Sequence, residues 1–459
     1  MKLKLGVAVT RRDCFQNEKT LENRDRILQK VAELSKELDF DYVTTDFLGG
    51  ERMMIELSDA AKVEEYFKAE KVDALFIPHA NFGQEESVAR LAKNMGLPLL
   101  IWGPRDECPK GQELRPTDTQ CGLFACSKVL RRYGVTFSYI ENCDVEDPAC
   151  RKGLEKFLAV ARVVNKFHHL RIGQVSVRPR QFMSVMCNEA ELLERFGIEV
   201  VPIPAYDIVA STRKIREEWD SETQEILDAI HAKGIDTREF GEERLKLMCA
   251  LETALLRFAR EFSLDALSVE CWDVFLNDLG FKPCFVFGDL TDRMLPCACE
   301  NDIHGAIMLA LAVAANNQKE PPFFADLTIR HPHNDNAELL WHCGPFAKSL
   351  MKEGASPSLA QEGQGFYPIH GGQVTLLRFD ALKGNYTLFA DSAQGTDGPE
   401  TCGNYLWVEV DDWVKWEKKF IFGPYIHHVT GLFGDYVDVF QEVCRYMDIP
   451  YDNADKPLF

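Results

Sequence analysis

The sequence has no long apolar run, and we expect no secretory leader because its first residues lack the pattern of a signal peptide. Within its 459 residues, no stretch of about 18 apolar residues occurs, so we expect no membrane-spanning helix. The N-terminus, MKLKLGVAVT, lacks the longer apolar region and the small-residue cleavage site of a signal peptide, and it is typical of a first β-strand. We therefore expect a cytoplasmic protein.

Positive charge is also scarce. The chain has 52 lysines and arginines against 72 aspartates and glutamates, which gives a net charge of −20. Nucleic-acid binding needs clustered lysine and arginine, so we expect no nucleic-acid partner. We interpret the acidity as a contribution to solubility.

A disulfide framework is absent as well. The 15 cysteines are odd in number and scattered through apolar segments, as in proteins of a reducing compartment. Cys297 and Cys299 have a C-x-C spacing, but no second cysteine pair follows at the distance of a zinc ribbon. We interpret these two as alternating residues of a strand, not as metal ligands.

The order of apolar patterns predicts an α/β protein with a β-rich end, and the chain is too long for one core. Short apolar strands alternate with helical periodicity up to about residue 165. The pattern then restarts at RIGQVSV, which resembles LKLGVAV and is likewise followed by arginines. This predicts two flavodoxin-like, doubly wound α/β domains, residues 1–168 and 169–320. From about 320, the segments GQVTLLRFD, NYTLFAD and NYLWVEV alternate between Gly-rich turns, which predicts a mainly antiparallel, barrel-like domain, residues 321–459, with a final helix.

Two acids and two histidines form the main candidate site. Glu300 lies where a strand turns into an apolar helix, and Asp326 closes the next apolar strand, PPFFAD. Acids at the ends of consecutive buried elements can point into one cleft. His342 and the pair His427–His428 follow. Mixed carboxylate and imidazole ligands suit Mn²⁺, Fe²⁺, Co²⁺ or Zn²⁺.

Each of these residues also has a structural interpretation. Glu300 begins a helix, where the macrodipole stabilises an acid whatever its function. Asp326 is compatible with a turn, and His342 with a hydrogen-bonded position in a sheet. The four residues Glu300, Asp326, His342 and His428 therefore predict a metal site as a set, not singly.

Further residues are weaker candidates for substrate contacts. His304 follows Glu300 by four residues and is predicted on its helix face. Glu270 ends the strand DALSVE, and Asp289 in VFGDLTD is predicted at a strand end that faces the cleft. Arginines in predicted loops could meet an anionic substrate, although solvated loop arginines are commoner; these are Arg11, Arg12, Arg105 and Arg115.

Several motifs resemble the L-fucose/L-arabinose isomerase family of metal-dependent aldose–ketose isomerases. ACENDIHGAIM resembles the motif that carries the first metal-site glutamate, here Glu300, and FFADLT the motif with the second acid, Asp326. ELLWHCG and GPYIHHVTG resemble the two histidine motifs and map to His342 and His428. The aspartate is similar to the fucose-isomerase branch and His342 to the arabinose-isomerase branch, so neither sugar preference carries over.

The resemblance implies a reaction, a cofactor and an assembly. A proton would move between C1 and C2 of a monosaccharide through a cis-enediol, with Glu300 and Asp326 as the catalytic carboxylates. A divalent metal, Mn²⁺ first and Co²⁺, Fe²⁺, Mg²⁺ or Zn²⁺ otherwise, would be held by Glu300, Asp326, His342 and His428. The family implies a homo-oligomer, a hexamer or another multimer, with sites near subunit contacts, and Arg11 is comparable to an early arginine that reaches a neighbouring subunit's site. His427 is a further candidate for contact with the sugar.

Two alternatives stay open at this point. A metal hydrolase or a non-haem iron enzyme would also use two histidines and a carboxylate. A non-catalytic sugar-binding protein would also be compatible with paired flavodoxin-like domains. The sugar, its chirality and any anionic substituent do not follow from the sequence.

Overall fold

The computed structural model describes residues 2–108, 111 and 115–457. The chain forms two compact units, which we describe separately: Met1–Asn165 with Arg445–Asp448, and Lys166–Cys444 with Ile449–Phe459. Among the described residues, none of the helices combines the length and apolar character that a membrane crossing requires.

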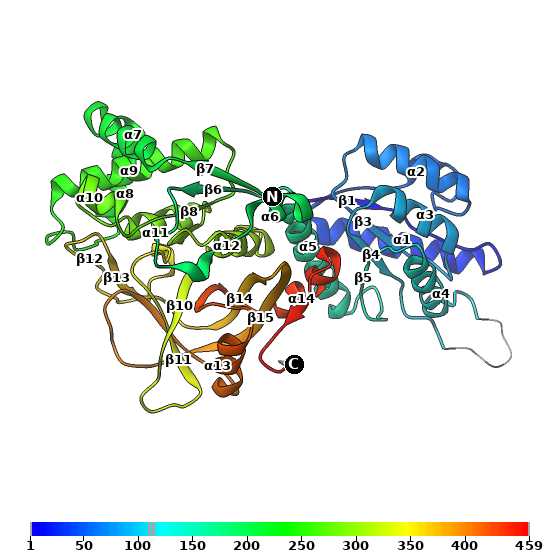
Figure 1. The fold of residues 1–459 in the computed structure, drawn as a ribbon. Helices are drawn as coiled ribbons and strands as arrows, with labels where there is room; N and C mark the ends of the chain where they lie inside the picture. Colours follow the sequence, from blue (N-terminus) through cyan, green and yellow to red (C-terminus); the bar gives the residue numbers. More distant parts are fainter. Residues whose placement is uncertain (1, 109–110, 112–114, 458–459) are drawn as a thin grey trace. The chain divides into compact units, whose positions relative to one another are not determined.

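The first unit is built on a five-stranded parallel sheet with the order β2-β1-β3-β4-β5 (Figure 1). Its strands are β1 Lys4–Val7, β2 Asp41–Val43, β3 Ala74–Pro78, β4 Leu99–Trp102 and β5 Ser138–Tyr139. Its helices are α1 Asn17–Glu37, η1 Asp46–Leu48, α2 Leu57–Ala69, α3 Glu85–Met95, α4 Thr119–Arg132 and α5 Pro148–Phe167. One apolar cluster contains residues of α1 and α5 and another those of α2, α3 and α4, so helices cover both faces, as parallel sheets require.

The second unit begins with a smaller parallel sheet of order β7-β6-β8-β9. Its strands are β6 Arg171–Val175, β7 Glu199–Ile203, β8 Ala266–Val269 and β9 Cys297–Cys299. Its helices are η2 Met183–Val185, α6 Glu189–Phe196, α7 Ala205–Glu218, α8 Ser221–Ala232, α9 Glu242–Glu261, α10 Val274–Leu279, α11 Cys284–Asp292 and α12 Ile303–Ala315.

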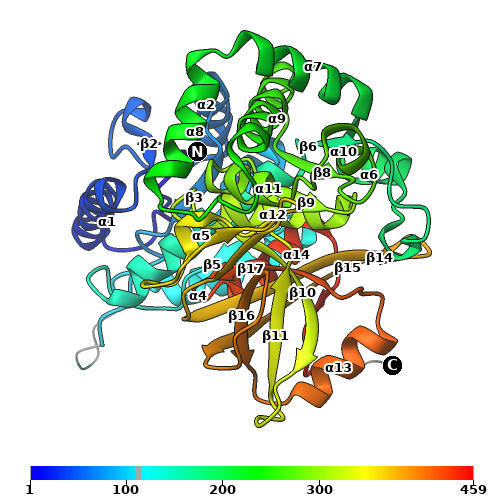
Figure 2. The ribbon, with the colours of Figure 1, turned by 90° about the vertical axis from the view of Figure 1, so that its left-hand side faces the viewer.

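A six-stranded antiparallel barrel follows in the same unit, and Figure 2 shows its long strands below α12. Its strands are β10 Phe323–Arg330, β11 Ala337–His342, β14 Gln373–Leu382, β15 Asn385–Thr396, β16 Asn404–Glu409 and β17 His428–Phe433, and the β15–β16 pairing closes it. Around it lie η3 Lys348–Leu350, β12 Ser358–Leu359, β13 Gly365–Pro368, α13 Trp413–Phe422, α14 Val437–Met447 and β18 Tyr451–Asp452. The predicted α/β architecture with a C-terminal antiparallel barrel is thus confirmed. The flavodoxin-like detail and the domain limits at 168 and 320 stay predictions.

Helix α12 joins the parallel sheet to the barrel. It contacts β6, β8 and β9 on one side and β10, β14 and β17 on the other. Twelve of its thirteen residues are buried, in keeping with a sequence that is apolar all round. A Cβ at Gly305 would lie 2.5 Å from the Phe324 ring, so only glycine lets the helix approach β10 this closely. The helix therefore brings the loop before it, which contains Glu300, against the barrel.

Two local predictions were wrong. Asp326 does not close its strand, because β10 continues to Arg330 and pairs with β11 through a register shift after Leu327. Asp289 does not lie at a strand end, because VFGDLTD belongs to helix α11. Cys297 and Cys299 do lie at alternate positions of strand β9, as predicted.

Candidate metal centre

Glu300 lies in a tight loop between β9 and α12. Glu300 and Asn301 both have left-handed backbones, with φ of 61° and 60°, which is a strained arrangement for two non-glycine residues. The Asn301 backbone N–H donates to the Val269 carbonyl at 3.2 Å, and its amide donates to the Val175 carbonyl at 3.2 Å. The loop is thus fastened to the carboxyl ends of β8 and β6, and the indole N–H of Trp272 donates to Glu300 Oε1 at 3.1 Å.

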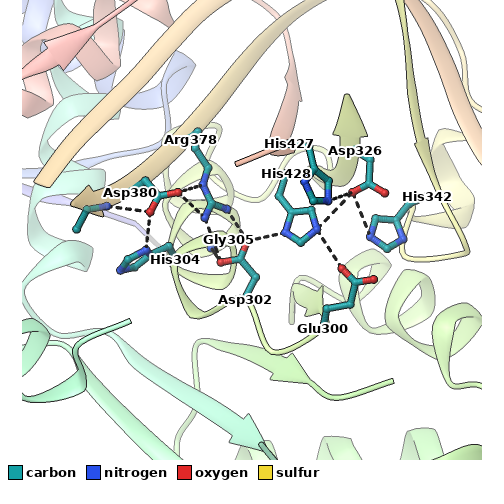
Figure 3. Close-up of polar contacts among 11 residues, drawn as sticks. Glu300, Asp302, His304, Gly305, Asp326, His342, Arg378, Asp380, His427 and His428 are labelled. Atoms are coloured by element: carbon teal, nitrogen blue, oxygen red, sulfur yellow. Dashed lines mark hydrogen bonds and ion pairs between the residues drawn. The ribbon is translucent and has the colours of Figure 1, made fainter. Parts of the chain in front are cut away.

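The barrel strands bring the other three predicted ligands to this loop. Asp326 on β10 is directly opposite His428 on β17, and β11, which ends at His342, pairs with β10 on its other side. His428 Nε2 lies 3.0 Å from Glu300 Oε2 and 3.4 Å from Asp326 Oδ1. His342 Nε2 lies 3.8 Å from the same Asp326 oxygen. Figure 3 shows these side chains pointing toward one another.

The donor atoms fit a divalent cation. Asp326 Oδ1, His342 Nε2 and His428 Nε2 are buried and form no hydrogen bond of good geometry among the described residues; their contacts with one another and with Glu300 are ion pairs at 3.0, 3.4 and 3.8 Å. Buried polar atoms normally form hydrogen bonds, so three convergent exceptions need an explanation. Ligand atoms of Glu300, His342 and His428 lie within 4.8 Å of one another, as do those of Asp326, His427 and His428. Two carboxylates and two imidazoles at this spacing form a ligand set for a hard or borderline ion.

The electrostatics point the same way. Burial alone lowers the pKa of His428, but the carboxylates of Asp302 and Glu300 beside the ring outweigh it and raise that pKa to about 9. Burial opposes the charge on Glu300 too, yet its contact with His428 holds its pKa below the usual value. Protons on the imidazoles thus balance the carboxylates. A bound cation would do the same and displace those protons.

A buried chain of charged side chains fixes the orientation of His428 through its Nδ1 atom. Its Nδ1 lies 2.9 Å from Asp302 Oδ2, and Asp302 forms an ion pair with Arg378 (Figure 3). Arg378 also pairs with Asp380 at 2.8 Å, and Asp380 meets His304 Nδ1 at 3.2 Å. A carboxylate at Nδ1 places the proton there and leaves Nε2 free to bind a metal. Asp302 is therefore a positioning residue for His428.

His342 is held in place by Cys343. The Cys343 backbone N–H donates to His342 Nδ1 at 2.9 Å, and Cys343 Sγ lies 3.2 Å from the same nitrogen. These contacts fix the orientation of the ring, with Nε2 toward Asp326 at 3.8 Å.

An aromatic wall lies beside the carboxylates. The Phe182 ring stacks on Trp272, with centroids 5.8 Å apart, and on His427, with centroids 5.7 Å apart. Glu270 supports this wall indirectly, because it accepts backbone N–H bonds from Trp272 at 2.7 Å and Asp273 at 3.0 Å at the start of α10. Apolar faces of this kind suit the C–H faces of a sugar ring.

Two arginines border the same loop. A pocket of ≈ 600 Å³ is lined by residues that include Arg178, Arg180 and Asn301, the last of which follows Glu300 directly. Arg178 donates to the carbonyl oxygens of Pro179, Arg180 and Phe182. Among the described residues, neither arginine forms an ion pair with a carboxylate.

Comparison with known proteins finds relatives of one kind. Residues 6–168 match the family "Fucose/sulfoquinovose isomerase, N-terminal domain". A sulfoquinovose isomerase from Alkalicoccus urumqiensis is 26% identical over 335 residues, which cover 72% of this chain and 73% of that protein. The sulfoquinovose isomerase of Priestia aryabhattai is 24% identical over 380 residues, covering 80% and 82%. The chain is therefore similar to isomerases of the fucose/arabinose isomerase-like family.

Solved structures add little to this assignment. A periplasmic solute-binding protein from Actinobacillus succinogenes aligns at 10% identity and a TM-score of 0.19, covering 70% of this chain and 94% of that chain. A TM-score this low supports no conclusion. The isomerase relatives and the matching isomerase domain support the predicted enzyme class, an aldose–ketose isomerase.

Several predicted residues lie apart from the donor atoms of this isomerase. His304 turns to Asp380 and the Phe379 ring, because Glu300 precedes the helix and the two do not share a helical face. Asp289 lies in a buried network with Lys348, at 2.5 Å, and Arg293, at 3.6 Å. Glu270 is used by backbone N–H groups, as described above.

The arginines named from the sequence belong to the first unit, and three of the four pair with carboxylates there. Arg11 is buried and pairs with Glu51. Arg12 pairs with Glu85 at 2.8 Å, and Arg115 with Asp118 at 3.0 Å. Arg105 donates to the Asn142 carbonyl at 3.1 Å.

Proposed function

We propose that the protein is a divalent-metal-dependent isomerase that interconverts an aldose and a ketose by proton transfer between C1 and C2 through a cis-enediol. The observation that carries this proposal is the convergence of three buried atoms without a hydrogen bond of good geometry, Asp326 Oδ1, His342 Nε2 and His428 Nε2, beside the Glu300 carboxylate. Similarity to sulfoquinovose isomerases supports the reaction class.

Glu300, Asp326, His342 and His428 would hold the ion. When bound, a divalent metal polarises the substrate carbonyl and neutralises charge that develops on its oxygens. Two carboxylates favour a harder ion, so Mn²⁺ is our first choice, with Co²⁺, Fe²⁺, Mg²⁺ and Zn²⁺ as the others.

The protein's own groups would carry out the proton transfer. Glu300 and Asp326 face the same space from opposite elements, the loop before α12 and strand β10. A carboxylate held in place needs no reorganisation to accept a proton from one carbon and return it to its neighbour. Trp272 fixes one oxygen of Glu300 through its indole N–H, and this limits the rotation of the carboxylate.

We further propose that the substrate is an aldose with an anionic end. Arg178 and Arg180 provide positive charge beside the Glu300 loop without a carboxylate partner among the described residues. The relatives named above are sulfoquinovose isomerases, and a sulfonate accepts hydrogen bonds from guanidinium groups as a phosphate does. Sulfoquinovose is therefore the first substrate to test. Phe182 and Trp272 would contact the ring between the two ends.

A substrate panel in D₂O tests the reaction and the substrate together. Mn²⁺-loaded protein is incubated with sulfoquinovose, glucose 6-phosphate, glucose, fucose and arabinose, and ketose and deuterium at the exchanged carbon are followed by NMR. We expect turnover of an anionic hexose above the neutral sugars, and a loss of that preference in Arg178→Gln. No ketose and no exchange with any sugar would rule out the isomerase and favour a metal hydrolase or a non-haem iron enzyme. Binding of sugar without turnover would favour a sugar-binding protein.

The homo-oligomer with sites near subunit contacts and the cytoplasmic location stay predictions. Sedimentation of the purified protein at several concentrations would measure the first.

A further inference from the structure

Four cysteines converge beside the proposed metal centre. Cys271 follows β8, Cys284 begins α11, Cys299 ends β9 and Cys343 follows β11. All four are free; the first three are buried and Cys343 is partly exposed. They come from four separate segments of the second unit, so no local motif requires them to meet.

Their thiols are connected through neighbouring pairs. Cys343 Sγ lies 3.2 Å from Cys284 Sγ. The sulfurs of Cys299 and Cys343 and a ring nitrogen of His342 all lie within 4.8 Å of one another. The Cys271 thiol forms hydrogen bonds with those of Cys284 and Cys299. The four thiols therefore form one connected cluster.

The backbone is shaped to permit this cluster. Gly344, next to Cys343, has a φ of +148°. A Cβ on it would lie 2.8 Å from the carbonyl carbon and 2.9 Å from the Cβ of Cys284. Only glycine allows the two cysteine segments to approach this closely.

We propose that Cys271, Cys284, Cys299 and Cys343 form a second metal site, selective for a thiophilic ion of the Zn²⁺ or Cd²⁺ type. Buried cysteines are usually inert apolar residues, but such residues have no reason to meet sulfur to sulfur. Thiolates select soft and borderline ions, and a tetrahedral zinc–sulfur site has bonds of about 2.3 Å, which places its sulfurs roughly 3.8 Å apart. The Cys284 and Cys343 sulfurs, 3.2 Å apart, would move slightly apart to reach that spacing.

The site differs in chemistry from the carboxylate–imidazole centre, although His342 touches both. Each thiol that binds the ion releases its proton to solvent, and no oxidant or reductant is required. Mn²⁺ prefers oxygen and nitrogen ligands, so the carboxylate–imidazole centre would bind Mn²⁺ and the cysteine site a thiophilic ion.

Titration with Cd²⁺ tests this site, because thiolate binding produces a charge-transfer absorption in the ultraviolet that carboxylate or imidazole binding does not. The reduced, Mn²⁺-loaded protein is titrated, and proton release is measured in parallel. We expect one Cd²⁺ per chain with the thiolate band, and an affinity at least tenfold weaker in Cys284→Ser and in Cys343→Ser. The matched control is Cys297→Ser, which changes another buried cysteine on the same strand as Cys299 and should keep the band.

Two results would overturn the proposal: absence of the thiolate band in the wild-type protein, or an equal band in all variants. A Cys284–Cys343 disulfide in protein purified without oxidant, seen by mass spectrometry, would also overturn it. Asp326→Asn separates the two sites, since it should abolish Mn²⁺ binding and leave the Cd²⁺ band in place.

Discussion

The second unit contains two buried clusters of charge that look alike in the sequence and differ in the structure. Around Asp289, two carboxyl groups, those of Glu252 and Asp289, meet two cations, Lys348 and Arg293. At the metal centre, the only basic side chains that pair with Glu300 and Asp326 among the described residues are histidines, with no lysine or arginine. A balanced cluster stabilises the fold, whereas an unbalanced one predicts a missing cation.

Removing one acid from each cluster tests most strongly whether the two clusters differ in function. Glu300→Gln should lower kcat by about 10³-fold or more, because it removes a proposed ligand and a proposed proton-transfer group. Asp289→Asn, the matched control, should change stability and leave kcat per folded molecule within about twofold. Ketose formation by NMR, with circular dichroism of both variants, measures the difference. Equal losses of kcat in the two variants would contradict the assignment of one cluster to catalysis and the other to the fold.

A substitution in the Asp289 cluster should lower the free energy of unfolding. Lys348→Met removes one of two cations from buried carboxyl groups, and breaking a buried pair in this way costs roughly 3–5 kcal/mol. Chemical denaturation, followed by tryptophan fluorescence, would show the loss. A variant as stable as the wild type would mean that the ion pair contributes little to the fold.

The chain of charges behind His428 allows a finer test. Asp302→Asn keeps the side-chain oxygen that caps α12 but removes the carboxylate at His428 Nδ1. Loss of such a partner typically weakens metal affinity by about 10–100-fold. Calorimetric titration with Mn²⁺ measures it. Asp380→Asn, one link further away, should have a smaller effect, and the reverse order would contradict the positioning role of Asp302.

Glu338 shows what burial does to an acid without a close cation. Burial raises its pKa to about 7, with Glu417 adding to the rise and Arg330 opposing it. Since this pKa exceeds the ordinary value of about 4.3, the folded protein binds the extra proton between these pH values, and stability falls as the pH rises toward 7. Glu338→Gln should therefore be about 1–2 kcal/mol more stable than the wild type at pH 8, and no more stable at pH 4. Denaturation midpoints at both pH values check this, and a difference independent of pH would contradict it.

The sequence predicted the architecture and brought attention to the residues that now lie together. Period-2 alternation after residue 320 and the apolar α12 segment were sufficient for the barrel and for the helix beside it. Asp289 was misplaced because a short apolar run such as PCFVFGDL does not distinguish a buried strand from a buried helix. Strand β10 extends past Asp326 because it pairs with β11, and that tertiary pairing is invisible in PPFFAD.

The residues that contact the histidines could not be predicted from the sequence, for a different reason. Asp302 had a visible local signal, an acid at the N-cap of an apolar helix. Its role depends on Arg378 and His428, which are 76 and 126 positions away. The cysteine cluster likewise joins four distant segments, and the C-x-C spacing of Cys297 and Cys299 drew attention to one residue that lies outside it.

Mn²⁺ binding followed by electron paramagnetic resonance tests the central claim most directly, since bound Mn²⁺ loses much of the sharp signal of the free ion. Metal-free wild-type protein and the Asp289→Asn control should each bind one Mn²⁺ per chain, while Asp326→Asn should bind none at the same concentrations. Absence of binding in the wild type, or unchanged binding in Asp326→Asn, would contradict the metal centre proposed for this isomerase.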